Sequence, residues 1–144
     1  MQMKKLKKCI LLLLCVALIA ALALTLTGCN KSGANNSVAF AEGGEMGKGE
    51  TTFQFIVTDG DGKQTSFQIH TDKTIVGDAL MELGLIEGEP GEFGLYVKTV
   101  NGITADFDTD GTYWAFYVNG EYASAGVDTT PIEAGATYAM KVEK

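Results

Sequence analysis

The residues best suited to chemistry are three aspartates at alternate positions, Asp106, Asp108 and Asp110, followed by Gly111. Carboxylates at this spacing ahead of a glycine match the first half of a calcium-binding loop. The second half does not match, because Tyr117 stands where the bidentate glutamate would be, and a strand pattern follows in place of a helix. The sequence therefore favours a solvated acidic turn, with a weak calcium site as the alternative.

Other chemistry has few residues to draw on. His70 is the only histidine, and it alternates with Ile69, so we expect its side chain to face solvent. Without a second histidine or a free cysteine there is no zinc constellation, and a plain surface residue is favoured over a pH-sensitive or cobalt-coordinating one. No serine or threonine stands in a recognisable nucleophile motif, and no carboxylate pair has a pattern that would separate the two pKa values. We therefore expect that the protein is not an enzyme.

The densest group of aromatic residues lies in segment 111–127, which reads GTYWAFYVNGEYASAGV. Its Asn119-Gly120 pair is a strong signal for a two-residue hairpin turn, which would set Tyr117 opposite Tyr122. Alternation then gives the hairpin two faces. One face carries Tyr113, Ala115, Tyr117 and Tyr122, and the other carries Trp114, Phe116, Val118 and Ala123.

A single helix can cover only one of these two faces. The other should remain an exposed apolar patch, which in a soluble domain usually marks a binding surface. The alternative is that a loop, such as 87–93 (EGEPGEF), folds over it. Periodicity does not decide which face is outside, although tyrosines tolerate water better and weakly favour their own face.

The first 29 residues predict where the protein is delivered. Residues 1–8 carry four lysines and residues 9–24 form a short apolar run, a combination typical of an export signal. The run is followed by Leu26–Cys29 (LTGC), which resembles the bacterial lipobox, where a peptidase cuts ahead of a cysteine that receives lipid. We expect 1–28 to be a lipoprotein signal peptide and Cys29 to be lipidated, rather than a plain secretion signal with an incidental cysteine. The protein would then sit, lipid-anchored, on the extracytoplasmic face of a bacterial membrane.

Processing would leave an acidic chain without disulfides. Cys9 and Cys15 lie in the removed segment, so Cys29 is the only cysteine left. Four of the 11 lysines also lie there, which leaves seven lysines against 18 acidic residues, a net charge of −11, and the chain has no arginine. Phosphate backbones and anionic headgroups would be repelled, so we expect no nucleic-acid partner and a membrane link through the lipid alone.

The remaining chain divides into a tether and one small domain. Residues 29–50 are rich in Gly, Ser, Ala and Asn and lack periodicity, which predicts a flexible tether. The domain spans 51–144 and opens with two alternating runs, 52–58 and 65–71. The Gly-rich segment 59–63 (DGDGK) between them predicts a hairpin turn.

The rest of the domain predicts one helix and four more strands. The period changes over 75–83, which predicts a helix capped by Thr74 and ended by Gly84. Further strands are expected at 94–100, 113–118, 121–125 and 137–143. The order hairpin, helix, strand, hairpin, strand predicts an α+β domain that is β-grasp-like, with one helix across a small mixed sheet.

Several segments resemble the transcobalamin-like C-terminal domain family. They are 94–103 (GLYVKTVNGI), 112–116 (TYWAF), the Asn-Gly hairpin, and 125–138 (AGVDTTPIEAGATY). The family includes the β-domain of intrinsic factor and transcobalamin and many bacterial surface lipoproteins. The likeness covers 51–144 in order and is strongest from Gly94 onward.

The resemblance implies a set of ligand-binding residues. In the vitamin carriers this domain closes over the upper face of cobalamin with apolar side chains, and the matching positions here are Val97, Trp114, Phe116 and Ala123. The resemblance thus implies that the Trp114 face is outward, and we adopt that expectation. Ala123 is smaller than the family's leucine, which implies a shallower contact or a different ligand. The carriers also enclose the vitamin with a large helical domain, so a partner protein would have to complete the site here.

We therefore expect a lipid-anchored surface module that binds cobalamin or another corrinoid for uptake and passes it to a transporter, without chemistry on the ligand. The alternative is a protein-interaction or adhesion module that uses the same patch, or a free strand edge, and has no small-molecule ligand. Calcium is the only other ligand that the sequence suggests.

Overall fold

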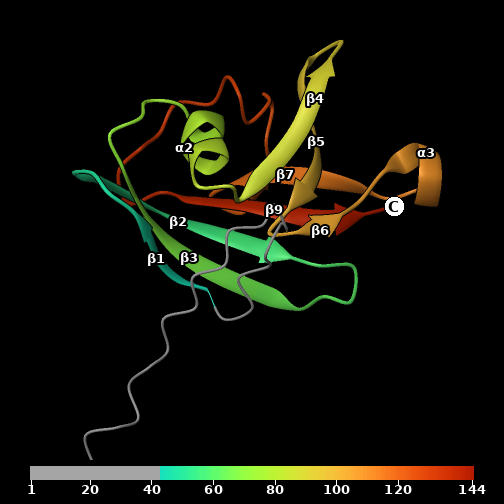
Figure 1. Cartoon of the computed structure of the whole chain (residues 1–144), viewed down its shortest axis with the longest axis horizontal. Coiled ribbons are helices and arrows are strands. Elements are labelled where there is room, and N and C mark those ends of the chain that lie inside the picture. The colour runs from blue at the N-terminus through green and yellow to red at the C-terminus, as the bar shows by residue number, and fades with distance from the viewer. Residues whose placement is uncertain (1–42) are drawn as a thin grey trace, which may run out of the picture. The chain divides into compact units, whose positions relative to one another are not determined.

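The computed structural model describes residues 43–144, which form two small sheets and two short helices (Figure 1). The predicted signal peptide, Cys29 and the tether up to residue 42 lie outside the described residues. In chain order the elements are β1 (Gly44–Gly47), β2 (Thr51–Thr58), β3 (Gln64–Thr71), α2 (Val76–Glu82), β4 (Ile86–Gly91), β5 (Gly94–Val100), β6 (Ile103–Thr104), α3 (Phe107–Asp110), β7 (Tyr113–Val118), β8 (Glu121–Tyr122) and β9 (Thr137–Glu143). Neither helix of this described part is long and apolar enough to cross a membrane.

The larger sheet has six strands in the order β1-β3-β2-β9-β7-β8. β2 and β3 form the predicted hairpin, with Phe55 opposite Phe67. Asp59 closes its turn, because one carboxylate oxygen accepts hydrogen bonds from the backbone N–H groups of Asp61 and Lys63, both at 2.9 Å. β9 runs parallel to β2 and antiparallel to β7, so it joins the two hairpins into one mixed sheet.

One face of this sheet builds the core. The side chains that alternate inward from β2, β3 and β9 are enclosed: Phe53, Phe55, Val57, Phe67, Ile69, Tyr138 and Met140. The rings of Phe53 and Tyr138 meet edge-on, with 5.2 Å between their centroids. Enclosing each such side chain contributes about 1.5–3 kcal/mol. Because 43–144 contains no cysteine, this apolar burial, rather than a disulfide, holds the domain together.

Helix α2 packs its enclosed side chains, Val76, Ala79 and Leu80, into the same core. The predicted cap at Thr74 is wrong, because the N-cap is Ile75 and no side chain caps this end. The first N–H groups are instead bonded to the carbonyls of Thr130 and Val127, at 3.0 and 2.8 Å.

The C-terminal end of α2 is the one that the sequence predicted. Gly84 adopts a left-handed φ of 68°, and its N–H donates to the carbonyl of Met81. The N–H of Leu85 donates to the carbonyl of Leu80, which completes a Schellman motif.

The expectation of a single sheet is wrong. The segment expected to be a loop, 87–93, contributes to strand β4, which pairs with β5, and β5 pairs with β6. These three strands form a second sheet beside α2, on the core side of the larger one (Figure 1). Pro90 is a residue that usually favours a loop. β4 is an edge strand, however, and proline is tolerated there because one side of the backbone has no partner.

The tether was predicted to extend to residue 50, and this prediction is wrong for the last residues of the segment. Residues 44–47 form β1, which pairs in parallel with β3 at the edge of the larger sheet. The glycines of this segment led to the prediction of a flexible tether, and one of them, Gly47, also allows β1 to lie close to β3. A Cβ on Gly47 would lie 2.2 Å from the carbonyl oxygen of His70, so only a residue without a side chain permits this approach.

Candidate functional site

The structure brings together the four residues that the sequence assigned to ligand binding. Val97 lies on β5, Trp114 and Phe116 lie on β7, and Ala123 directly follows β8. All four line one cleft of about 230 Å³ between the two sheets. Most other lining residues come from the same strands, from β9 and from the loop after β8, among them Leu95, Tyr96, Tyr122, Val127 and Met140.

The hairpin turn explains why Ala123 reaches this cleft. Asn119 and Gly120 have φ values of 50° and 84°, as a two-residue turn of the type I′ class requires. The turn sets Tyr117 opposite Tyr122, as predicted. The N–H of Ala123 then donates to the carbonyl of Phe116 at 2.9 Å, which places Ala123 beside the aromatic floor of the cleft.

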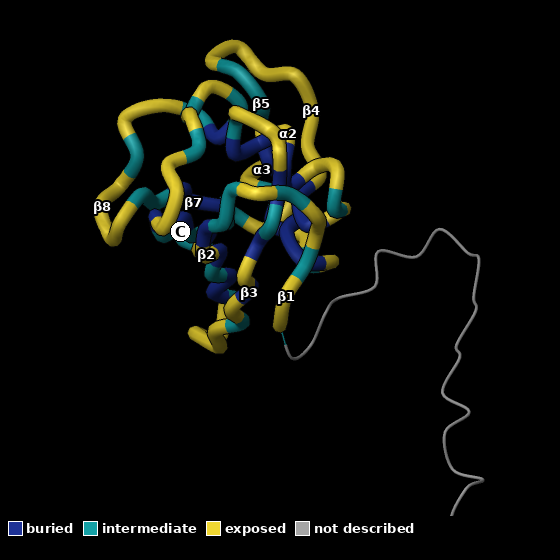
Figure 2. Tube along the Cα trace, turned by 90° about the vertical axis from the view of Figure 1, so that its left-hand side faces the viewer, coloured by how far each residue is buried: buried dark blue, intermediate teal, exposed yellow. Residues whose placement is uncertain are grey.

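The expectation of an open apolar shelf is wrong. The exposed fractions of Trp114, Phe116 and Val97 are only 7%, 8% and 7%. The smaller sheet and the loop after β8 cover this face. The alternative that segment 87–93 folds over it is closer to the structure, because that segment contributes to β4 of the smaller sheet, although as a strand and not as a loop. What remains accessible is the narrow cleft. The opposite face of β7 carries Tyr113 and Tyr117, which are half-buried, and the adjacent Tyr122 is 62% exposed within a largely exposed β8 segment (Figure 2).

Two polar atoms beside this cleft are enclosed and lack a hydrogen-bond partner. They are Nε1 of Trp114 and Oδ1 of Asp128, and in residues 43–144 they are the only enclosed side-chain N or O atoms in this situation. The other carboxylate oxygen of Asp128 accepts the N–H of Leu95 at 3.1 Å. Asp128 was missed from the sequence because it lies in an irregular loop, where no periodicity indicates its direction.

The open face of β7 carries a hydrogen-bonded carboxylate. The hydroxyl of Tyr117 donates to Oε1 of Glu143 at 2.5 Å, and that of Tyr113 donates to Oε2 at 3.5 Å. The bond to Glu143, together with burial, raises the pKa of Tyr117 to about 12. The same bond, helped by Lys141, lowers the pKa of Glu143. These groups hold β7 to β9, and Tyr113 also lines the cleft.

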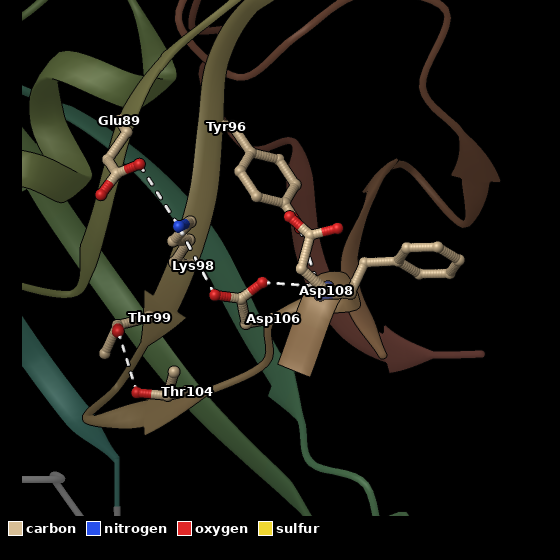
Figure 3. Close-up of polar contacts among 8 residues, drawn as sticks. Glu89, Tyr96, Lys98, Thr99, Thr104, Asp106 and Asp108 are labelled. Carbon is tan, nitrogen blue, oxygen red and sulfur yellow. Dashed lines mark hydrogen bonds and ion pairs between the residues drawn. The ribbon is translucent and has the colours of Figure 1, made fainter. Parts of the chain in front are cut away.

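The three aspartates of the calcium alternative do not converge on one point. Asp106 is the N-cap of α3 and accepts the N–H of Asp108 at 3.1 Å (Figure 3). Asp110 accepts both the N–H and the hydroxyl of Thr112, and these bonds lower its pKa. The aspartates cap a short turn, and in the described part of the chain no group of three potential metal ligands is present.

Lys98 links the strands around α3. Its Nζ lies 3.3 Å from Oε2 of Glu89 on β4 and 3.5 Å from Oδ2 of Asp106 (Figure 3). The hydrogen bond to Glu89, opposed by some burial, raises the pKa of Lys98.

His70, expected to face solvent, is half-buried because β1 lies beside it, with Gly47 as its partner in the ladder.

A second, larger hollow of about 470 Å³ lies on the other side of β8. Its walls are the β7–β8 turn and the loop 129–133, and it includes two carboxylates, Glu121 and Glu133. It shares Tyr122, Ala123 and Ala125 with the cleft, so the segment after β8 separates the two.

Comparison with known proteins gives a family and two solved structures. The family model described as "Domain of unknown function (DUF4430)" matches residues 72–144. A protein from Ruminococcus gnavus ATCC 29149, described as a candidate metal-binding protein, is 30% identical, with a TM-score of 0.62 over 66% of this chain and 98% of its own. Haptocorrin in complex with Cbi is 19% identical, with a TM-score of 0.49 over 65% of this chain, which spans about a quarter (25%) of haptocorrin. No curated protein matches the sequence.

The family match begins at the end of β3 and includes all four residues assigned to ligand binding. The R. gnavus structure extends the similarity to almost its whole length. The relation to the transcobalamin family therefore stays a resemblance, whereas the closer assignment is established: this chain belongs to the DUF4430 family.

Proposed function

We propose that this protein is a β-grasp-like ligand-binding module and that the cleft between β5 and β7 is its binding site. One observation carries the proposal. Val97, Trp114, Phe116 and Ala123 come from three separate segments and line the same cleft. A cleft lined mainly by apolar and aromatic side chains is the usual form of a small-molecule site. The module would hold its ligand without reacting with it.

The proposed ligand is cobalamin or another corrinoid, of which the cleft would hold only one edge. Its volume of about 230 Å³ is below the roughly 300–1,000 Å³ of most ligand pockets. A corrinoid would therefore reach the floor residues Trp114 and Phe116 only with the edge that enters the cleft, instead of lying flat on an open shelf. Binding to this domain alone would be weak, and a second protein or a transporter would cover the rest of the ligand.

The module would act outside the cell. The lipobox-like segment and Cys29 support a lipid anchor on the extracytoplasmic side of the membrane, and the net charge of −11 after processing argues against nucleic acid as a partner.

The R. gnavus protein is described as metal-binding, but metal binding is not adopted for this chain, because no group of three potential metal ligands occurs within residues 43–144.

The test is a titration of the full-length protein, in detergent, with cobalamin. Trp114 is the only tryptophan, so its fluorescence reports on the cleft alone, and calorimetry measures the heat in parallel. Ala123→Phe should fill the cleft and weaken binding about tenfold or more, which corresponds to the loss of a few buried groups. Ala134→Phe is the matched control, because Ala134 is exposed and outside the cleft.

Saturable heat and quenching that Ala123→Phe removes and Ala134→Phe preserves are expected. Equal binding by both variants, or no binding at millimolar cobalamin, would contradict the proposal. The second result would favour the alternative, a protein-interaction module without a small-molecule ligand. The larger hollow beside β8 and the 93% exposed Phe93 at the tip of the β4–β5 hairpin favour that alternative.

A further inference from the structure

In residues 43–144, the two enclosed side-chain N and O atoms without a hydrogen-bond partner both lie beside the proposed ligand cleft. Trp114 itself lines the cleft, and its Nε1 can only donate a hydrogen bond. Asp128 lies behind the wall, because the N–H of the lining residue Leu95 donates to its Oδ2 at 3.1 Å, and a Cβ on the lining residue Gly126 would lie 2.6 Å from its Oδ1. A carboxylate oxygen can only accept. One donor and one acceptor without partners are therefore enclosed beside the cleft.

The position of the acceptor is fixed by its neighbours. The Oδ2 atom of Asp128 is held by the N–H of Leu95 at 3.1 Å, which leaves Oδ1 as the free acceptor. Two glycines make room for this carboxylate: a Cβ on Gly126 would lie 2.6 Å from Oδ1, and a Cβ on Gly94 would lie 3.0 Å from it. Oδ1 thus occupies this position only because these two residues lack side chains.

Resting on the proposed function, we infer that the cleft recognises a carboxamide group on its ligand. The carbonyl oxygen of a carboxamide would accept from Nε1 of Trp114, and its N–H would donate to Oδ1 of Asp128. A carboxamide carries an acceptor and a donor on one planar carbon, so a single neutral group supplies both kinds of partner that the unmatched atoms lack. A purely apolar group would leave both atoms unpaired, and a carboxylate would bring a second negative charge beside Asp128.

The group reaches these atoms only when the wall of the cleft moves, because both atoms are closed to water. In the wall segment 123–126, Ala123 is bonded to Phe116 and the carbonyl of Gly126 accepts from Thr129 and Thr130, whereas Ser124 and Ala125 between them are exposed and belong to no helix or strand. The aromatic floor is anchored in the sheet, where Phe116 pairs with Met140. Recognition would therefore involve a shift of the loop against a fixed floor.

The test uses two small probes, benzamide and acetophenone, on the full-length protein. They share a planar ring and a carbonyl group, and only benzamide has N–H donors. The single indole N–H resonance of Trp114 gives a direct readout in a ¹H–¹⁵N spectrum. Benzamide should shift this resonance to lower field in a saturable way and bind about tenfold more tightly than acetophenone, as one hydrogen bond to a charged acceptor implies.

Asp128→Asn is the diagnostic variant, because it keeps an oxygen for the N–H of Leu95 and places an amide NH₂ where Oδ1 was. It should abolish the preference for benzamide. If it does not fold, Gly126→Ala is the second variant, since its methyl group would lie 2.6 Å from Oδ1 and displace this atom, which should also remove the preference. Equal affinity for the two probes, or a preference that survives in the folded variant, overturns the inference.

The outcome is separable from that of the cobalamin experiment. Cobalamin binding that Ala123→Phe removes, together with equal binding of the two probes, retains the proposed function and refutes the carboxamide. A preference for benzamide without any cobalamin binding retains the carboxamide site and refutes the corrinoid as its ligand.

Discussion

At the scale of single residues, the pair Tyr117 and Glu143 gives a pH-dependent contribution to stability. The pKa of Tyr117 is raised from 10.0 to about 12, so the folded state holds this proton more tightly. That contribution is complete below pH 10 and is lost as the pH rises through 12. The pKa of Glu143 is lowered from 4.5, so its contribution is complete above pH 4.5 and is lost as the pH falls.

Tyr117→Phe should therefore raise the pKa of Glu143 toward its ordinary value, because the principal donor to the carboxylate is removed. A ¹³C NMR titration of the carboxyl group measures this directly. Tyr113→Phe is the matched control, since its bond to Glu143 is longer, at 3.5 Å, and the change should be smaller. An unchanged Glu143 pKa in Tyr117→Phe would show that the hydrogen bond does not form in solution.

The three aspartates around α3 lead to a second prediction, that calcium leaves the melting temperature unchanged. The carboxylate of Asp106 caps α3 and forms an ion pair with Lys98, and that of Asp110 accepts a hydrogen bond from Thr112. A calcium ion that used Asp106 and Asp110 together would compete with these bonds. Melting scans with calcium and with a chelator check this, and a rise in melting temperature that depends on calcium would restore the calcium alternative.

The sequence predicted single residues well where the cause was local. The Asn119-Gly120 turn and the left-handed Gly84 depend on backbone conformations that neighbouring residues specify. The prediction of a cap at Thr74 was wrong because the first N–H groups of α2 donate hydrogen bonds to carbonyls of a distant loop, those of Thr130 and Val127. The four cleft residues were found only through a family resemblance, and Asp128 was not found.

At the scale of elements, helix α2 is pressed against the loop that carries Asp128. A Cβ on Gly77 would lie 3.0 Å from the Cα of Asp128 and 3.0 Å from the carbonyl oxygen of Val127. The loop cannot easily retreat, because that carbonyl accepts the N–H of Gly77 at 2.8 Å. Gly77 therefore sets the distance between the helix and the wall of the cleft.

Gly77→Ala should destabilise the protein by about 1–3 kcal/mol, the usual cost of overpacking. Helix propensity alone predicts the opposite sign, a gain of about 1 kcal/mol for replacing glycine within a helix. Urea unfolding decides between the two. Gly60→Ala is the matched control, because its Cβ would meet only Val142 at 3.8 Å and should leave stability nearly unchanged. Greater stability of Gly77→Ala would mean that the loop yields freely.

The alternating pattern predicted most strands and the division of β7 into two faces, but not which face is covered. Alternation within a strand identifies two sides, whereas cover depends on how separate segments pack. The strand β4 has no alternating pattern and contains glycine and proline, so it was taken for a loop. Its pairing with β5 creates the second sheet, which turns the predicted open shelf into a narrow cleft.

At the scale of the whole molecule, the domain begins before the hairpin from which its start was predicted. β1 adds a strand to the outer edge of β3, and the side chain of Met46 packs against the core. The N–H of Glu50 then donates to Asp72 at 3.0 Å, which fixes the chain where it enters β2. An open edge of β3 would otherwise present unpaired backbone groups to other chains. Residues 43–50 are therefore part of the fold and not only of the tether.

A chain that begins at residue 43 should accordingly be more stable than one that begins at residue 51, by about 1–3 kcal/mol, since a few net hydrogen bonds and the Met46 contact are lost. Urea unfolding measures the difference, and light scattering should show more aggregation of the shorter chain. Gly47→Val in the longer chain should reproduce the loss without shortening, because its Cβ would lie 2.2 Å from the carbonyl oxygen of His70. Glu45→Ala, at an exposed position of the same strand, should not. Equal stability of the two chain lengths would mean that β1 adds nothing to the fold and that the tether reaches residue 50 after all.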